Sequence, residues 1–262
     1  MNKTQIGKAM RLGMWLLWAA ALAGCAPAGE ALYQYSTIPA LMEGVYDGEL
    51  TLGELRRRGD LGLGTFNALD GEMIVLDGAV YQATADGKVR RAPDGGKTPF
   101  AAVVPFRPAA GGWRYDPERD GASLEKYLDT LAPSANLAYA VRIDGTFRNV
   151  MVRSVPAQRR PYPRLAQAAA GQKVFELTGV RGTIVGFRLP EYLAGVNVPG
   201  WHLHFLSADR AAGGHLLRCR AEQADVRVME IRRVELQLPD TPEFRAIQLT
   251  GPKHQELRKI EK

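Results

Sequence analysis

The sequence predicts an α/β protein of the α+β-like kind, with two sheet-rich parts. We expect a mixed sheet in the N-terminal half and mainly antiparallel strands in the C-terminal half. The 262 residues include 28 Gly and 16 Pro, and aromatic and β-branched residues recur between them, a pattern typical of many short strands joined by turns. Helical spacing of apolar residues is confined to a few segments. A stretch rich in Pro and Arg, residues 156–164, is expected to link the two halves.

The first 24 residues have the organisation of a signal peptide. A positive segment precedes residues 12–22, which are apolar but too few for a comfortable membrane span. The string Leu22-Ala23-Gly24-Cys25 follows and resembles a bacterial lipobox. We therefore expect cleavage before Cys25, a diacylglycerol on its thiol, export to the cell envelope, and a tether over residues 25–31. Ordinary cleavage at the Ala-rich end, without lipid, is the alternative.

The N-terminal half, residues 32–155, is expected to contain short helices and hairpins. Residues 38–42 are apolar and predict a helical turn. Thr51 can cap a helix over residues 51–58, because Glu54 stands three residues later, as in a capping box. The later elements expected in this half are strands at 73–76 and 80–83 around the turn Asp77-Gly78, a strand at 98–106, and an amphipathic helix at 123–131.

Two more strands are expected just before the linker, and strands dominate the sequence after it. Residues 138–143 and 149–152 alternate like two paired strands around a turn at Asp144-Gly145. The C-terminal half, residues 156–262, is expected to contain strands at 173–177, 182–189, 202–206, 215–220, 226–231 and 234–238, and then a short polar helical tail.

The composition favours no nucleic-acid partner. The chain is 46% hydrophobic and 24% charged, an ordinary globular balance. Its formal net charge is +6, but Lys and Arg are scattered, with short clusters at residues 56–58 and 159–160. A groove for nucleic acid would interleave basic residues with exposed aromatic ones. We interpret the charge as a solvated, mildly basic surface that can also attract small carboxylates.

Three of the four histidines lie between positions 202 and 215. His202 and His204 are separated by one residue, so they share one face of a strand. Residues 207–214 form a turn sequence, and a hairpin centred there places His204 opposite His215, with His202 as a diagonal neighbour. Three converging imidazoles can hold a catalytic Zn²⁺ with one open position. Cu, Ni and Fe also accept imidazole ligands, so the residues alone leave the metal open.

A site with three histidines is compatible with several functions. A zinc hydratase of the carbonic anhydrase type also uses three histidines on strands, and it needs no arginine to bind its substrate. A non-enzymatic lipoprotein that binds metal would have further exposed histidines or acidic tracts, whereas His254 is the only other histidine here. A cupin usually has a glutamate soon after its His-x-His, and residues 205–209 contain none.

From about Leu32 to its end, the chain resembles the α-acetolactate decarboxylase family. The strings that carry the resemblance are Tyr33-Gln34-Tyr35-Ser36-Thr37-Ile38, Gly62-Leu63-Gly64-Thr65-Phe66-Asn67-Ala68-Leu69-Asp70-Gly71-Glu72-Met73, Lys97-Thr98-Pro99-Phe100-Ala101, Arg160-Pro161-Tyr162-Pro163, Asn197-Val198-Pro199-Gly200-Trp201-His202-Leu203-His204-Phe205 and Gly213-Gly214-His215. The Leu-Asp-Gly-Glu string together with His-x-His and Gly-Gly-His is highly specific.

The resemblance implies decarboxylation of α-acetolactate to acetoin and CO₂ by a homodimer with two α/β parts and large sheets. It implies the following site residues: His202, His204 and His215 as Zn²⁺ ligands, Glu72, Arg153 and Glu261 as catalytic groups, and Thr65, Leu69 and Arg153 as substrate-binding groups. Glu256 is the alternative to Glu261, because the tail is short and its alignment is the weakest part of the match.

The chemistry of the substrate agrees with these roles. α-Acetolactate carries a hydroxyl, a ketone and a carboxylate, and a metal can chelate two of these oxygens and stabilise the enediolate left by CO₂. Arg153 could hold the carboxylate through its planar fork. Glu72 or Glu261 could then deliver the proton.

Overall fold

The computed structural model describes residues 31–117 and 123–249. Its helices and short turns are α1 (Ile38–Met42), α2 (Leu52–Arg58), η1 (Asn67–Leu69), α4 (Leu124–Leu131), α5 (Leu165–Ala169), η2 (Glu191–Leu193) and α6 (Pro242–Ala246). Its strands are β1 (Ala31–Tyr35), β2 (Leu50–Thr51), β3 (Leu61–Thr65), β4 (Glu72–Leu76), β5 (Ala79–Ala83), β6 (Val89–Arg91), β7 (Lys97–Thr98), β8 (Ala101–Val104), β9 (Trp113–Tyr115), β10 (Ala138–Ser154), β11 (Lys173–Leu189), β12 (Gly200–Ser207), β13 (Gly213–Ile231) and β14 (Arg233–Gln237).

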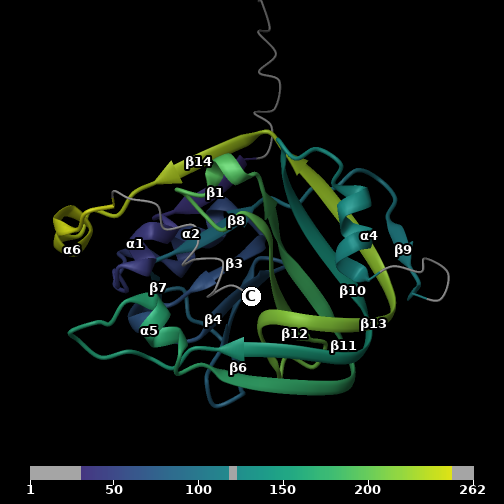
Figure 1. Cartoon of the computed structure of the whole chain (residues 1–262), viewed down its shortest axis with the longest axis horizontal. Helices are drawn as coiled ribbons and strands as arrows, with labels where there is room; N and C mark the ends of the chain where they lie inside the picture. Colours follow the sequence, from purple (N-terminus) through teal and green to yellow (C-terminus); the bar gives the residue numbers. More distant parts are fainter. Residues whose placement is uncertain (1–30, 118–122, 250–262) are drawn as a thin grey trace, which may run out of the picture.

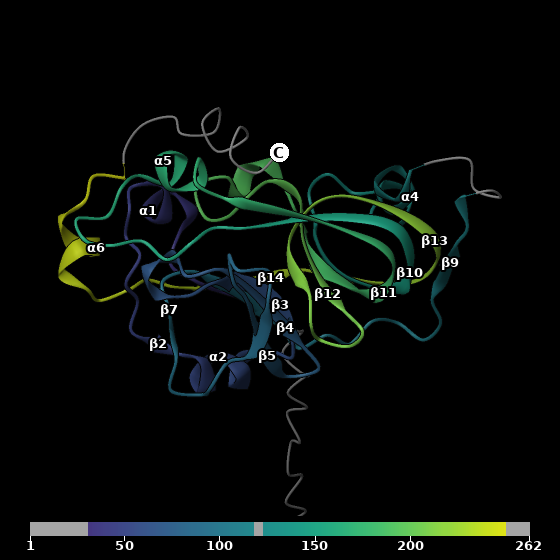
Figure 2. The same ribbon diagram turned by 90° about the horizontal axis from the view of Figure 1, so that it is seen from below.

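Two sheets form the body of the protein (Figures 1 and 2). The first has seven strands in the order β14-β1-β8-β3-β4-β5-β6, and the second has five in the order β10-β11-β12-β13-β9. In the first sheet β1 is parallel to β14, while the other pairs are antiparallel. All strand pairs of the second sheet are antiparallel. The predicted fold class, with a mixed sheet and an antiparallel sheet, is therefore confirmed.

The second sheet closes on itself and encloses a core of its own. β10 pairs with β11 and also with β13, while β12 pairs with both β11 and β13, so the ladder of pairings returns to its start. Phe147 and Phe205 pack edge to face in this core, with ring centroids 5.6 Å apart. A separate buried cluster joins the two sheets, with Leu63 and Ile74 from the first and Val185 and Phe187 from the second. β12 and β13, which carry the three clustered histidines, contribute residues to both clusters.

Several predictions that depend on residues close together in the sequence, such as caps, hairpin turns and short helices, are confirmed. Thr51 caps α2, and its hydroxyl accepts a hydrogen bond from the Glu54 amide at 3.2 Å while the Glu54 carboxylate accepts one from the Thr51 amide at 2.9 Å. Asp77 and Gly78 both have positive φ, 52° and 72°, as a tight hairpin between β4 and β5 requires. The helix expected at residues 123–131 is α4.

The expected turn at Asp144-Gly145 is wrong. Both residues lie inside the continuous strand β10, opposite Thr183 and Gly182 of β11. Partners distant in sequence override the turn signal, because the Asp144 carboxylate is hydrogen-bonded from neighbouring strands and a Cβ at Gly145 would lie 2.5 Å from the Gln223 carbonyl oxygen. The strand pairs expected at 173–177 and 182–189, and at 215–220 and 226–231, are likewise the single strands β11 and β13.

Strand pairings cross the expected division between residues 155 and 156. β10 lies before it but pairs with β11 and β13, and β9 pairs with β13. β14 lies after it but completes the first sheet beside β1. Each sheet therefore contains strands from both halves of the chain.

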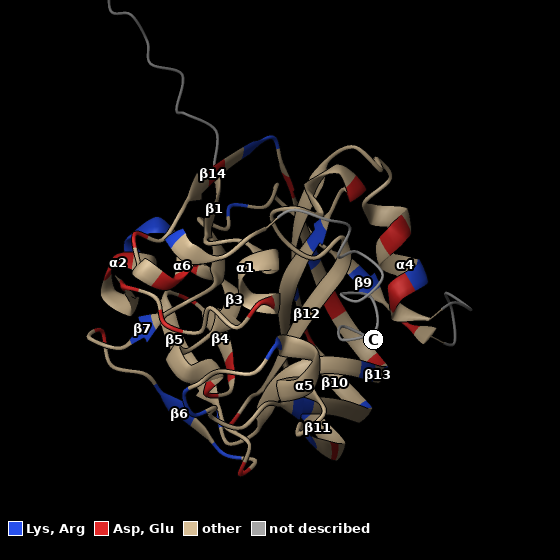
Figure 3. Ribbon diagram, turned by 60° about the vertical axis from the view of Figure 1, so that its left-hand side comes forward, with Lys and Arg blue, Asp and Glu red and all other residues tan. Residues whose placement is uncertain are grey.

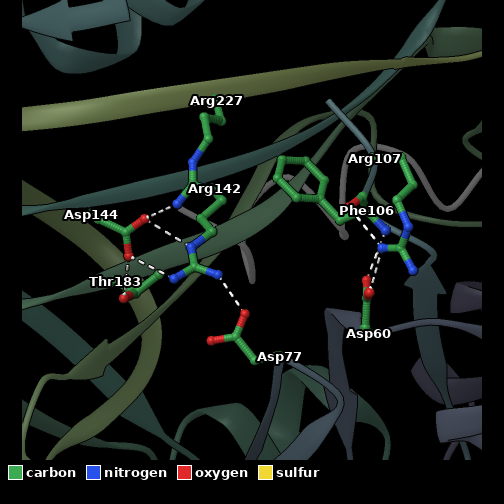
Figure 4. A network of polar contacts seen from close by, with 8 residues as sticks. All are labelled: Asp60, Asp77, Phe106, Arg107, Arg142, Asp144, Thr183 and Arg227. Atoms are coloured by element: carbon green, nitrogen blue, oxygen red, sulfur yellow. Dashed lines mark hydrogen bonds and ion pairs between the residues drawn. The ribbon is translucent and has the colours of Figure 1, made fainter. Parts of the chain in front are cut away.

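A polar network ties the sheets together at the surface (Figure 4). Arg142 of β10 donates to Asp77, in the turn between β4 and β5, at 2.5 Å and to Asp144 at 2.8 Å. Asp144 also accepts hydrogen bonds from Thr183 at 2.8 Å and from Arg227 at 2.6 Å. Burial raises the pKa of Asp144, but these donors outweigh it and hold the pKa below its usual value. The network therefore contains an ionised carboxylate at neutral pH.

Along the ribbon, positions occupied by Lys or Arg and by Asp or Glu alternate over many elements rather than gathering on one (Figure 3). Within residues 31–117 and 123–249, none of the helices has the length and apolar character needed to span a membrane. The expected signal peptide, Cys25, most of the tether, Glu256 and Glu261 lie outside the described residues.

Candidate metal centre and its pocket

The turn between β12 and β13 brings the three clustered histidines together. His204 lies directly opposite His215 in the antiparallel register, as the sequence predicts. His202 lies two residues before His204 on the same strand, and all three side chains are buried. One ring nitrogen of each histidine lies within 4.8 Å of the others. Three buried imidazoles thus point to one place, an arrangement suited to a metal ion.

The hydrogen bonds of His204 fit a metal ligand. Its Nδ1 lies 2.8 Å from the carbonyl oxygen of Met73, so Nδ1 carries the proton and donates it, because a carbonyl only accepts. Its Nε2 is buried and has no hydrogen-bond partner, which is costly for a polar atom unless another group binds it. Burial and then Arg153 lower the pKa of His202 to about 3, and burial lowers the pKa of His204 well below its usual value. Both imidazoles are therefore neutral, the form that binds metals.

Arg153 reaches the histidines from β10. It lies opposite His215 in the register of β10 and β13, and it is 4% exposed. Gly214 allows this approach, because its φ is 151° and a Cβ there would lie 2.5 Å from the Arg153 carbonyl oxygen. The Gly-Gly-His string therefore brings His215 and Arg153 to the same place.

One pocket contains every described residue that the sequence proposed for the site. It has about 430 Å³ of space between protein atoms, open solvent at its mouth included. Its polar lining consists of Thr65, Glu72, Arg153, His202, His204 and His215. Its apolar lining, apart from Gly64, consists of Ile38, Leu41, Leu69, Phe100, Val155 and Leu165, which we call the apolar wall. The lining suits a small molecule with polar groups on one part and apolar groups on another.

Glu72 connects the arginine and the histidines of this pocket. Its Oε1 lies 3.7 Å from Nη1 of Arg153, and its Oε2 lies 3.7 Å from Nε2 of His204. Glu72 is 8% exposed, so the carboxylate is held beside a cation in a largely dry environment. A carboxylate placed in this way can exchange protons with a molecule bound next to the histidines.

The loop before Glu72 has an unusual backbone that places Leu69 in the pocket. Ala68 and Leu69 have positive φ values of 61° and 55°, rare for residues with a side chain. Gly71 has φ 83°, and a Cβ there would lie 2.4 Å from the Ala83 carbonyl oxygen. The amide of Gly71 donates to the Val155 carbonyl at 3.1 Å. The Leu-Asp-Gly-Glu string therefore contains two pocket residues and the glycine that lets the chain turn between them.

A family model decides how this site is to be classified. Residues 32–251 match the model described as Alpha-acetolactate decarboxylase. The chain belongs to the alpha-acetolactate decarboxylase family. The resemblance seen in the sequence strings is therefore confirmed, and the family is one of carboxy-lyases.

Relatives and solved structures agree with this membership. The chain is 46% identical over 236 residues to the alpha-acetolactate decarboxylase of Methanosarcina mazei, covering 90% of this chain and 81% of that protein. It is 46% identical over 213 residues to that of Methylococcus capsulatus, covering 81% and 82%. The crystal structure of the Bacillus subtilis strain 168 alpha-acetolactate decarboxylase superposes with a TM-score of 0.82 at 37% identity, covering 88% of this chain and 98% of that one.

Two of the strings shared with the decarboxylase family are joined by buried hydrogen bonds next to the strand that carries His202 and His204. The buried side-chain amide of Asn197 donates to Oε1 of Gln34 at 2.5 Å, and its side-chain oxygen accepts a hydrogen bond from the main-chain amide of Val198 at 2.6 Å. The Gln34 amide in turn donates to the carbonyls of Tyr35 and Ser36 at 3.0 and 3.1 Å. This buried chain of bonds fastens the segment before β12 to the end of β1.

Sequence reasoning missed most of the apolar wall. The wall residues that it did not propose are Ile38, Leu41, Phe100, Val155 and Leu165. In the sequence they look like ordinary core residues, because nothing distinguishes a leucine that packs on protein from one that lines a cavity. Ile38 and Phe100 do lie in strings shared with the decarboxylase family, which is the one signal that could have found them.

Proposed function

We propose that this protein decarboxylates α-acetolactate to acetoin and CO₂, with a Zn²⁺ ion held by His202, His204 and His215. The observation that carries the proposal is the presence of these histidines in one pocket with Arg153 and Glu72. Three neutral nitrogen ligands leave a divalent metal its full charge, which suits Lewis-acid chemistry on an anionic substrate rich in oxygen. When bound, the ion supplies electrostatic stabilisation to the negative charge that develops on the substrate oxygens.

Arg153 is proposed to bind the substrate carboxylate. Its guanidinium is buried in the pocket, and a planar guanidinium pairs with a carboxylate through two parallel hydrogen bonds. Such a contact orients the bond that breaks with respect to the histidines. It also favours this reaction over the hydration of CO₂, because a carbonic anhydrase type of hydratase has no need of a buried arginine.

Glu72 is proposed to deliver the proton that completes the reaction. Loss of CO₂ leaves the bonding electron pair on the substrate as an enediolate, and the carbon that lost the carboxylate must gain a proton. Glu72 lies beside both Arg153 and His204, within reach of a molecule bound between them. The family resemblance also assigns a carboxylate to Glu261, with Glu256 as the alternative, and we propose Glu261 as the second acid group.

We also propose that the protein acts outside the cytoplasm as a lipid-anchored homodimer. The leader at residues 1–24 and the lipobox string ending in Cys25 motivate the export and the anchor. The dimer is an expectation from the family. Light scattering on protein that starts at residue 26 measures its mass in solution, and a monomer would contradict the dimer.

The decarboxylation is tested with purified protein that starts at residue 26. Racemic α-acetolactate is supplied, acetoin is measured by its colour reaction, and bound metal is measured by elemental analysis. We expect about one Zn²⁺ per chain, acetoin production that stops after chelation, and recovery when Zn²⁺ is returned. Metal-loaded protein that forms no acetoin would contradict the proposal. Rapid hydration of CO₂ by the same sample would favour the hydratase instead.

A further inference from the structure

The apolar wall of the pocket is one continuous surface. All six of its residues belong to a single buried cluster. Ile38 and Leu41 come from α1, and Leu165 is the first residue of α5. These two short helices lie side by side (Figure 2). The wall therefore includes a contact between two helices, whereas Glu72, Arg153 and the histidines all lie on strands.

Side-chain contacts, rather than a strand ladder, hold α5 against α1. The carboxylate of Asp47 accepts hydrogen bonds from Arg160 at 2.5 Å and from the Tyr162 hydroxyl at 3.1 Å. The rings of Tyr46 and Tyr162 lie 5.2 Å apart. Arg164, just before α5, donates to Glu43, just after α1, at 2.6 Å. These contacts fasten α5 to α1 through side chains that lie outside the two sheets.

The polar and apolar lining residues lie on different parts of the pocket, and this separation restricts how a substrate can bind. A 2-hydroxy-3-oxo acid has a carboxylate, a hydroxyl and a ketone, and the polar groups of the pocket account for these. Its alkyl groups must then lie against the apolar wall, because a buried alkyl group gains nothing from the charged side. Leu41 and Leu165 are 6% and 5% exposed, and each contributes a branched side chain from one helix of the pair.

We propose that Leu41 and Leu165 limit the size of the alkyl group on the hydroxyl-bearing carbon of the substrate. The substrate class is the 2-alkyl-2-hydroxy-3-oxo acids, in which this carbon carries a methyl group in α-acetolactate. The inference rests on the proposed decarboxylation and adds the residues that decide which members of the class are accepted. A pocket discriminates one methylene by roughly 10- to 200-fold when its walls cannot yield.

The test compares α-acetolactate with its homologue that carries an ethyl group in place of that methyl. The kcat/KM is measured for both substrates with the wild type, Leu41→Ala and Leu165→Ala, each loaded with Zn²⁺. We expect the ratio of ethyl to methyl kcat/KM to rise about tenfold or more in each variant, because truncation opens space for the added methylene. Leu165→Phe is expected to shift the ratio the other way.

Met42→Ala is the matched control. Met42 lies on α1 in the same cluster and is 1% exposed, but it does not line the pocket. It should lower stability and leave the ratio at the wild-type value. If Leu165→Ala fails to fold, Leu165→Val removes a single methylene and should give a smaller rise.

The outcomes separate this inference from the proposed function. An active wild type with the same ratio in the Leu41 and Leu165 variants would overturn the inference alone. An equal rise in Met42→Ala would also overturn it, because general loosening would then explain the change. A metal-loaded wild type that acts on neither substrate would overturn the decarboxylation and this inference together.

Discussion

The Nδ1 proton of His204 is donated to the main-chain carbonyl of Met73, 2.8 Å away. This bond joins β12 of the closed sheet to β4 of the seven-stranded sheet. It sets the tautomer of the imidazole, so that Nε2 keeps its lone pair for a metal. The residue before Met73 is Glu72, whose carboxylate lies 3.7 Å from that Nε2. One strand therefore orients a candidate ligand and supplies the candidate acid beside it.

Replacing His204 by alanine should remove the metal and the activity together. Two imidazoles remain, which leaves Zn²⁺ with too few protein ligands. We expect bound zinc well below one per chain and loss of nearly all acetoin formation. Elemental analysis and the acetoin assay on the same sample measure both. A variant that kept stoichiometric zinc and full turnover would show that the three-histidine site is wrong.

Replacing Glu72 by glutamine should keep the metal and lower kcat by about 10²-fold or more, the usual contribution of a general acid. The amide has nearly the same shape as the carboxylate but cannot transfer a proton. Steady-state kinetics with metal analysis measure the effect, and Glu176→Gln, at an exposed position on β11, serves as the control. A kcat equal to that of the wild type would remove Glu72 from the mechanism.

Replacing Asp144 by asparagine should destabilise the protein at neutral pH. The change leaves Arg142 and Arg227 without their shared carboxylate. We expect a loss of about 1–2 kcal/mol in the free energy of unfolding, because the Asp144 side chain is 31% exposed and solvent weakens the pair. Urea unfolding measures this loss. Asp94→Asn, which removes a more exposed partner of Arg56, should cost about 0.5 kcal/mol or less.

The loss of stability in Asp144→Asn should depend on pH. The pKa of Asp144 is lower in the folded protein than in the unfolded chain, so its contribution is fully present above the unfolded value near 4 and is lost as pH falls through the folded value. The stability difference between wild type and Asp144→Asn should therefore shrink below about pH 4. A difference that stayed constant down to acid pH would contradict the assigned pKa shift.

Replacing Glu261 and Glu256 by glutamine, one at a time, should show which of the two carboxylates takes part in the reaction. If Glu261 is the second acid group, Glu261→Gln lowers kcat strongly while the melting temperature changes little, because the amide has nearly the same shape as the carboxylate. Glu256→Gln should leave kcat unchanged. Kinetics and thermal unfolding of both variants measure this. The opposite pattern would move the assignment to Glu256.

Replacing Cys25 by serine should stop lipid attachment without harming catalysis. The cysteine thiol is the expected acceptor of the diacylglycerol, and the family match begins several residues later, at residue 32. Metabolic labelling with radioactive palmitate in a bacterial host should mark the full-length wild type and not the variant, while both form acetoin. Labelling that persists in Cys25→Ser would overturn the lipobox interpretation.

The sequence by itself determined the features that depend on neighbours a few residues apart. The capping box of Thr51 and Glu54, the hairpin at Asp77-Gly78 and the pairing of His204 with His215 all follow from local geometry. The family resemblance also brought Glu72 and Arg153 into the proposed site, where their side chains lie 3.7 Å apart. Local geometry alone would have treated both as surface charges.

Only the tertiary structure decided which apolar residues complete the pocket and how long the strands are. Asp144 and Gly145 have the sequence of a turn, yet hydrogen bonds from Thr183 and Arg227 on neighbouring strands hold them inside β10. Leu165 has the sequence of any core leucine, yet the contacts of Asp47 with the preceding segment bring α5 to the pocket. In both cases the deciding partners lie tens of residues or more away. Their free energy of interaction depends on the assembled fold and leaves no periodic pattern in the chain.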